Sequence, residues 1–277
     1  MRHAAEQAVK LANLTLRAQV WGDETAPPLL ALHGWLDNAG SFDRLAPLLA
    51  ARFRVIALDL PGHGHSDHLP IGASYHYLDY VKTVLAATEA LELRRYTLLG
   101  HSLGAGIASL VAAASPACIA RLLLIEGLGP LGDDGSRTLQ RFRDAMTRKD
   151  NRRPLRQFRD IEQALSARTI ASGMPATLAR PIVERGLIAG NGGWQWRSDP
   201  LLTRGSAARL AETQVQALLR GIRAPTALLL AQPETSYLPG APMQARADCV
   251  AGIAVNYLAG GHHLHLEHPQ AVADWIG

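Results

Sequence analysis

The chain has 277 residues, of which 48% are hydrophobic and 19% charged, a composition that can bury a sizeable core and that excludes a largely disordered protein. Its formal net charge of +4 is modest, so the distribution of the charges matters more than their total. This length fits one large α/β domain, or such a core with an inserted subdomain.

Targeting signals are not evident in the sequence. Residues 1–10 hold no apolar stretch of signal-peptide length, and no run approaches the roughly 18 to 20 apolar residues of a membrane span. The two cysteines, Cys118 and Cys249, cannot form a disulfide framework and are expected to pack, reduced, among apolar neighbours. We therefore expect a soluble cytoplasmic protein.

Short apolar segments alternate with helical ones through the first half of the chain. Residues 14–20 alternate apolar and polar side chains, which predicts a half-buried strand at an antiparallel sheet edge. Ser41 is expected to cap a short helix over residues 42–49, and Leu78, Val81, Leu85 and Thr88 share one face of a later helix. Further strands are predicted at 29–32, 54–58, 96–99, 121–125, 226–231 and 253–258, and those at 29–32 and 121–125 are apolar enough to be buried in the sheet. This alternation predicts an α/β fold with a doubly wound, mostly parallel sheet.

The rhythm of strands and helices breaks between about residues 132 and 223. Helical periodicity persists there, but strands vanish apart from a candidate at 194–196. We predict a core of residues 1–131 and 224–277 with an inserted, mainly helical cap, whose own core takes Trp194 and Trp196. Basic residues crowd the start of the cap: Arg137, Arg141, Arg143, Arg148, Lys149, Arg152, Arg153, Arg156 and Arg159. Without interleaved aromatics or a nucleic-acid-reading motif, they indicate solvated helices, and no nucleic-acid partner is expected.

The sequence Gly100-His101-Ser102-Leu103-Gly104 joins an apolar strand directly to a helix of small residues. A chain that turns from strand to helix within one residue forces that residue into a strained conformation. A Cβ on either flanking glycine is expected to collide with a neighbouring strand or helix. The Ser102 hydroxyl would then stand clear of the sheet at the positive end of a helix, which suits a nucleophile.

A serine hydroxyl is a poor nucleophile unless a neighbouring base takes its proton, and imidazole is the usual base near neutral pH. The segment after the last predicted strand holds four histidines: His262, His263, His265 and His268. We favour His262, because it directly follows the glycine pair Gly260-Gly261, where the loop can approach the serine. His263 should then point away, and the other two belong to the entry of the last helix.

The base in turn needs a carboxylate to fix its tautomer and stabilise its charged form. Glu126 ends the predicted strand at 121–125, and Glu234 lies four residues past the apolar run Leu228 to Leu230. Both belong to the carboxyl edge of the sheet, where ligands bind in such folds. We favour Glu126, because a carboxylate that ends a fully apolar strand is costly to bury without a partner. Glu234 stays the alternative acid.

An acyl-transfer site also needs hydrogen-bond donors for the oxyanion. The backbone N–H of Leu103, directly after the proposed nucleophile, is one candidate. The backbone N–H of Trp35, which follows His33-Gly34, is the other. His33 itself is interpreted as a structural hydrogen-bonding residue.

A rival pattern, His63-x-His65-x-Asp67-His68, matches a zinc-hydrolase signature, and its imidazoles and carboxylate suit zinc. That site needs further histidines from later strand ends in a two-sheet sandwich, whereas this chain alternates strands and helices. We therefore interpret the segment as a loop, Asp59-x-Pro-Gly-x-Gly-x-Ser66, and expect no metal in it.

Taken together, these segments resemble the α/β-hydrolase superfamily and, within it, the serine hydrolase-like proteins. The resemblance is carried by residues 33–38, 41–45, 59–66, 100–104 and 261–262, with His265, and it is loose in the cap. It implies a nucleophile at Ser102, a base at His262 and an acid at one of two strand ends. The superfamily commonly has an aspartate where this chain has Glu234, whereas the subgroup tends to carry its acid at the position of Glu126.

We therefore expect a capped, carboxylesterase-like serine hydrolase that cleaves an ester or similar small acyl compound through an acyl-serine intermediate. Its partner is a small-molecule acyl substrate, and no cofactor or metal is expected. The same fold also hosts ligand-binding proteins that turn over slowly or not at all, and this is the alternative.

Overall fold

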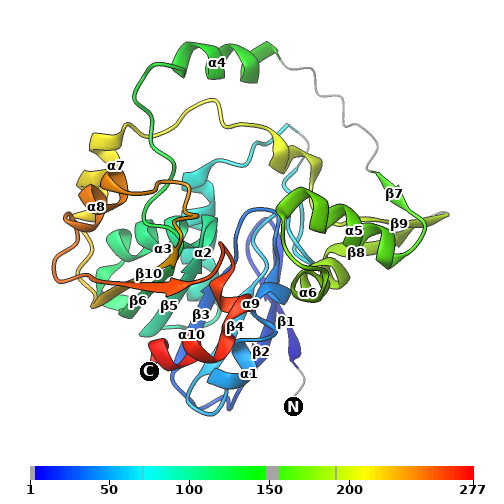
Figure 1. Cartoon of the computed structure of the whole chain (residues 1–277), viewed down its shortest axis with the longest axis horizontal. Helices are drawn as coiled ribbons and strands as arrows, with labels where there is room; N and C mark the ends of the chain where they lie inside the picture. Colours follow the sequence, from blue (N-terminus) through cyan, green and yellow to red (C-terminus); the bar gives the residue numbers. More distant parts are fainter. Residues whose placement is uncertain (1–3, 71, 148–155, 191) are drawn as a thin grey trace.

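An eight-stranded sheet lies at the centre of the computed structural model, which describes residues 4–70, 72–147, 156–190 and 192–277 (Figure 1). The strand order is β1-β2-β4-β3-β5-β6-β10-β11. The six strands from β4 to β11 run parallel, and β2 and β1 pair antiparallel at one edge. The strands are β1 (Ala5–Lys10), β2 (Thr15–Trp21), β3 (Pro28–Leu32), β4 (Arg54–Leu58), β5 (Tyr96–His101), β6 (Ile119–Ile125), β10 (Thr226–Gln232) and β11 (Ala254–Ala259).

Apolar side chains fill both faces of the sheet, because successive residues of a strand point to opposite sides. Leu30 and Leu32 of β3 belong to the core on one face, whereas Leu29 and Ala31 belong to the core on the other. The first core is covered by α2 (Tyr77–Ala90), α3 (Leu103–Ala114), α7 (Glu212–Leu219) and α8 (Ala241–Ala247). The second is covered by η1 (Ala39–Phe42), α1 (Ala46–Leu49), α9 (Leu264–Glu267) and α10 (Pro269–Ile276). The short η2 (Pro116–Cys118) leads into β6.

Between β6 and β10 the chain leaves the sheet. It forms α4 (Thr138–Thr147), β7 (Gln157–Phe158), α5 (Ile161–Ser172), α6 (Ala176–Gly186), β8 (Leu187–Gly190), β9 (Gly193–Trp196) and η3 (Pro200–Thr203), followed by α7. Helices α5 and α6 and a small β7-β9-β8 sheet enclose a core of their own, against which Trp194 and Trp196 pack. Helix α4 buries none of its side chains.

Buried polar contacts tie α5 and α6 to the loops after β3 and β4. Arg185 of α6 is 8% exposed; it hydrogen-bonds through Nε to both carboxylate oxygens of the fully buried Asp59, at 3.0 and 3.1 Å. The same guanidinium contacts Glu6 of β1. Asn38 Nδ2 donates to the carbonyl of Ile182 at 2.8 Å. This half of the insertion is therefore held at a fixed place over the carboxyl edge of the sheet.

Several expectations need correction. Strand β1 was not expected. It occupies the antiparallel edge, so the strand predicted at residues 14–20 lies inside the sheet rather than at its edge. Ser41 does not cap the predicted helix: it lies inside η1, which Asn38 caps, and bonds His265, while the predicted helix over 42–49 is reduced to α1, which begins at Ala46. The candidate strand at 194–196 lies within β9, whereas its partner β8 at 187–190 was not expected. Leu78 is half-exposed rather than on the buried face of α2.

Other expectations concern single features. Cys118 and Cys249 are free and partly buried. Within the described ranges, we find no helix that combines the length and the apolar character needed to cross a membrane. The described basic residues at the start of the insertion are at least partly exposed, whereas Arg148, Lys149, Arg152 and Arg153 lie outside the described residues.

Candidate active site

Ser102 lies at the sharp turn between β5 and α3, with φ 51° and ψ −111°. The turn is so tight that a Cβ on Gly104 would lie 2.1 Å from the carbonyl oxygen of Leu32. A Cβ on Gly100 would lie 2.5 Å from the carbonyl oxygen of Gly104. Both glycines are therefore needed for the helix to approach the sheet this closely. Ser102 is partly exposed at the N-terminus of α3, where the helix dipole favours developing negative charge.

Two of the residues predicted from the sequence meet at the carboxyl edge of the sheet. His262 Nδ1 lies 3.0 Å from Glu126 Oε2, although 136 residues separate them in the chain. The backbone carbonyl of His262 accepts a hydrogen bond from His101 Nε2 at 2.8 Å. Because His101 directly precedes Ser102, this bond ties the histidine loop to the turn that carries the serine.

The position of Glu126 is fixed by more than His262. It is fully buried, it has a positive φ of 56°, and its backbone N–H donates to Leu229 in the neighbouring β10. Its Oε1 accepts the backbone N–H of Ala231 and its Oε2 the hydroxyl of Thr235, both at 2.6 Å. Three donors thus converge on one buried carboxylate, which satisfies its hydrogen-bonding demand.

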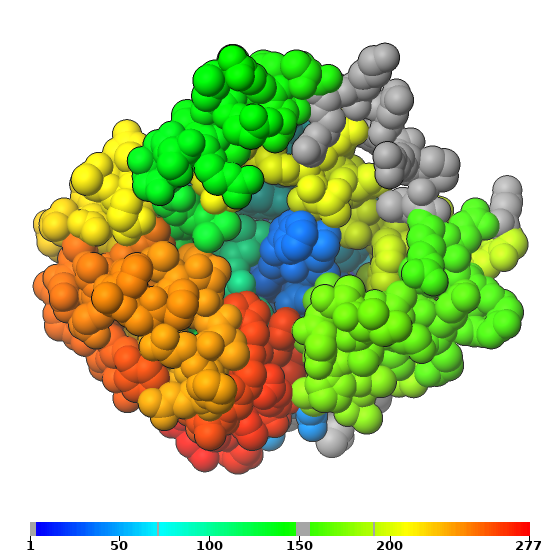
Figure 2. Space-filling view, turned by 45° about the horizontal axis from the view of Figure 1, so that its top comes forward, coloured from blue at the N-terminus to red at the C-terminus, as the bar shows by residue number. Residues whose placement is uncertain are grey.

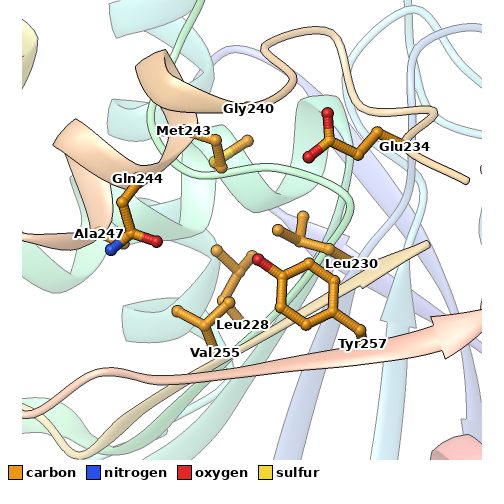
Figure 3. A pocket seen from close by; sticks show the side chains of 9 residues that line it. All are labelled: Leu228, Leu230, Glu234, Gly240, Met243, Gln244, Ala247, Val255 and Tyr257. Carbon is orange, nitrogen blue, oxygen red and sulfur yellow. The ribbon is translucent and has the colours of Figure 1, made fainter. Parts of the chain in front are cut away.

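Glu234 lies elsewhere. It is exposed at the side of a small pocket formed with α8, β10 and β11 (Figure 3), beside Gly240 and Tyr257. Within the described residues, no hydrogen bond joins Glu234 to His262. The pocket has a volume of 130 Å³, which is below the roughly 300 Å³ at which ligand pockets usually begin.

The other three histidines of the loop have separate partners or positions. His263 Nε2 lies 3.1 Å from Asp37 Oδ2, and His265 is buried with Nε2 2.6 Å from Ser41 Oγ. His268 lies exposed between α9 and α10. Of the four, His262 is the one that contacts a buried glutamate.

The backbone N–H of Leu103 directly follows the predicted nucleophile, and that of Trp35 lies in the turn after β3. Among the hydrogen bonds of the described residues, none is donated by the backbone N–H of Trp35 or of Leu103. Both N–H groups therefore have no protein partner in the described residues. The indole N–H of Trp35 reaches Leu202 of η3 at 3.0 Å. His33 is structural, as expected, because Nδ1 bonds the carbonyl of Gly34 and Nε2 accepts the N–H of Leu60.

The zinc-like pattern does not gather at one point. His63 Nδ1 bonds the carbonyl of Pro61, and His68 Nε2 bonds that of Arg197. Asp67 accepts the N–H of Thr15, and His65 lies 3.9 Å from Glu6. Ser66 Oγ donates to the carbonyl of Asp59, as a structural loop requires.

A polar cluster beside the site was missed at the sequence level. Burial alone would raise the pKa of Asp37, but His263, Arg168 and His101 outweigh it and hold that pKa well below the usual range. Burial, followed by the neighbouring histidines, lowers the pKa of His101 well below its ordinary value. The sequence did offer one signal for this cluster. Asp37, His101 and His263 each stand in a segment that carries a predicted site residue, namely Trp35, Ser102 or His262.

The face that carries the insertion is hollowed. Figure 2 shows green and yellow segments of the insertion, and orange and red segments from the C-terminal part, around blue atoms from the N-terminal quarter of the chain.

This fold, with its serine turn and its histidine–glutamate pair, is the architecture of a hydrolase.

Comparison with known proteins agrees. The pattern of the alpha/beta hydrolase fold family matches residues 27–269. A serine hydrolase-like protein of Dictyostelium discoideum is 30% identical over 95% of this chain and 77% of its own length. A probable serine hydrolase of Drosophila melanogaster is 31% identical over 95% and 83%. The chain belongs to the alpha/beta hydrolase family.

Solved structures show the same relationship. A hypothetical protein from Pseudomonas aeruginosa PAO1 superimposes with a TM-score of 0.91 at 37% identity, over 98% of this chain and 97% of that one. The thioesterase domain from the curacin biosynthetic pathway superimposes with a TM-score of 0.88 at 25% identity, over 99% of both chains.

Proposed function

We propose that this hydrolase cleaves an ester, or a similar small acyl compound, through an acyl-serine intermediate formed on Ser102. The observation that carries the proposal is the 3.0 Å contact between His262 Nδ1 and the buried Glu126, in a loop bonded to the residue before Ser102. Such a pair leaves the other ring nitrogen of His262 available as a base.

Each residue then has a defined part in the reaction. Glu126 holds the Nδ1–H tautomer of His262 and stabilises the imidazolium that forms. His262 takes the proton of the Ser102 hydroxyl as it attacks the acyl carbon, and later returns a proton to the leaving alkoxide. The N–H groups of Trp35 and Leu103 bind the oxyanion. Water, activated by His262, finally hydrolyses the acyl-serine.

In the part of the chain that the structure describes, Ser102 Oγ makes no hydrogen bond. Hydrogen bonds of catalytic groups often tighten only when substrate is bound. The alignment of Ser102 with His262 is therefore the point that an experiment has to test.

The first test is hydrolysis of short-chain p-nitrophenyl esters by the wild type and by Ser102→Ala. Loss of one triad member lowers turnover by several powers of ten. The proposal predicts that loss, and equal rates would rule out this mechanism for the esters tested. Acyl thioesters belong in the same panel, because the curacin-pathway neighbour is a thioesterase domain.

A fluorophosphonate probe separates this enzyme from a ligand-binding protein of the same fold. An activated Ser102 should be labelled covalently, and Ser102→Ala should abolish the label. A binding protein with a disarmed site should leave wild-type Ser102 unlabelled.

A further inference from the structure

A second group of polar side chains lies beside the proposed triad and includes none of its members. Asp37 follows β3, His101 ends β5 and His263 precedes α9. One ligand atom from each lies within 4.8 Å of the other two. Asp37 Oδ2 is the centre of the group, 3.1 Å from His263 Nε2 and 3.8 Å from His101 Nδ1.

The hydrogen bond of His101 settles which of its nitrogens carries the proton. Nε2 lies 2.8 Å from the carbonyl of His262, an acceptor, so Nε2 holds the N–H and Nδ1 the lone pair. Nδ1 is buried, and it has no hydrogen-bond partner among the described residues. A lone pair on Nδ1 therefore faces a carboxylate oxygen 3.8 Å away, with no donor between them.

Of the two groups, only His101 Nδ1 lacks a partner in the described part of the chain, and a cation bound by this lone pair and by the carboxylate would supply one. The bond to the His262 carbonyl fixes the Nε2–H tautomer of His101, which leaves Nδ1 as the nitrogen able to bind a metal ion.

We propose that Asp37, His101 and His263 form a binding site for one divalent transition-metal ion, with zinc as the best match. Two imidazoles and one carboxylate are ligands that zinc prefers, at about 2.0–2.2 Å each. A tetrahedral ion with such bonds holds its ligand atoms about 3.3–3.5 Å apart. The separations of 3.1 and 3.8 Å from Asp37 Oδ2 bracket that value, and all three ligand atoms lie within 4.8 Å of one another, so the side chains have to draw together to bind one ion. His263 binds through Nε2 once the proton on that nitrogen has moved to Nδ1.

The surroundings orient these ligands as the outer shell of a metal site does. The bond from His101 Nε2 to the carbonyl of His262 fixes its ring with Nδ1 toward Asp37. Arg168 holds the other carboxylate oxygen of Asp37. Its guanidinium also places a positive charge near the ion, so we expect binding weaker than at a structural zinc site and readily reversed by a chelator.

The test is titration of the chelator-treated, tag-free full chain with Zn²⁺, followed by calorimetry, together with absorption spectroscopy of the Co²⁺-substituted protein. The proposal predicts one ion per chain at the strongest site, and the intense visible bands of tetrahedral Co²⁺. His101→Gln keeps a donor at the Nε2 position but removes Nδ1, and His263→Asn removes Nε2. Each should weaken binding by 10-fold or more, as loss of a ligand does.

His76→Asn is the matched control, because it removes an imidazole whose contacts among the described residues include Ser206 and none of the three cluster residues. It should bind Zn²⁺ as the wild type does. Unchanged affinity in both cluster variants, or no stoichiometric binding by the wild type, would overturn the proposal.

If the variants do not fold, X-ray absorption on the zinc-loaded wild type decides the question. The proposal requires two imidazole nitrogens and a carboxylate oxygen around zinc, and any set with fewer than two imidazoles contradicts it. Because Ser102, His262 and Glu126 are not ligands, esterase activity and metal binding can fail independently.

Discussion

Ser102 and Glu126 both have positive φ angles, 51° and 56°, in a backbone region that non-glycine residues seldom occupy. Each follows the end of a parallel strand, and the two turns are joined because Ser102 N–H donates to the carbonyl of Ile125 at 2.9 Å. Strain of this kind persists only where surrounding contacts over-determine it, and it concentrates at functional sites. The pair of turns is therefore the rigid base of the proposed triad.

The sequence was sufficient to propose both residues. The Gly-x-Ser-x-Gly pattern points to Ser102, and the desolvation cost of a carboxylate after an apolar strand points to Glu126. The contacts of Thr235 and Ala231 with Glu126 could not be foreseen, because they depend on how β10 and the loop after it are placed. The Asp37 cluster was missed for the same reason.

The two glutamates give the sharpest residue-level prediction. Glu126→Gln should lower kcat for p-nitrophenyl esters by about 10⁴, because an amide N–H₂ facing His262 favours the wrong tautomer. Glu234→Gln is the matched control and should leave kcat unchanged, since Glu234 is exposed and away from His262. Steady-state kinetics of both variants decide the point. A large loss with Glu234→Gln alone would show that the acid has been misassigned.

At the level of elements, the inner parallel strands were predictable because each is a short apolar run covered on both faces, whereas every residue of β11 at the sheet edge is at least partly exposed. Strand β1 was not, since only Val9 of its six residues is buried and no periodicity results. The β8–β9 pair was only half predicted, because residues 187–190 are mostly exposed and are held by pairing with β9 rather than by burial.

The crossing of α3 over β3 is a testable feature of the fold. Gly104→Ala would place a methyl group 2.1 Å from the carbonyl oxygen of Leu32, so the helix must shift and the folded state should lose several kcal/mol. Gly205→Ala is the control, because a Cβ there meets open space. Urea denaturation measures both. A Gly104→Ala protein as stable as the wild type would contradict the tight crossing.

Helix α6 offers a second element-level prediction. Arg185→Ala should lower the free energy of unfolding by about 3–5 kcal/mol, because it leaves the buried carboxylate of Asp59 without its cation. Arg180→Ala, on the same helix, removes exposed pairs with Glu162 and Glu184 and should change stability little. Equal effects of the two substitutions in urea denaturation would show that the buried pair does not hold the insertion.

At the scale of the whole molecule, buried neutral histidines should make the fold sensitive to mild acid. Burial lowers the pKa of His63 from 6.5 to about 3, and it also lowers that of His33. Between those pH values the unfolded chain binds protons that the native chain does not. The free energy of unfolding should therefore fall as the pH drops below 6.5, by about 1.4 kcal/mol per pH unit for each such histidine.

His63→Asn tests this directly, because the Asn amide can still donate to the carbonyl of Pro61 but does not titrate. Urea denaturation from pH 7.5 to 4.5 should show a slope shallower by about one proton than that of the wild type. His76→Asn serves as the reference substitution. An unchanged slope in His63→Asn would mean that His63 is protonated in the folded protein.

Helix α4 turns Leu139, Phe142 and Met146 to the outside, each more than half exposed, and contributes nothing to any of the three apolar cores. Replacing those side chains should therefore change the free energy of unfolding little, so such variants should still fold. Substitutions in this helix should change the outer surface of the insertion while leaving the serine turn and Glu126 in place.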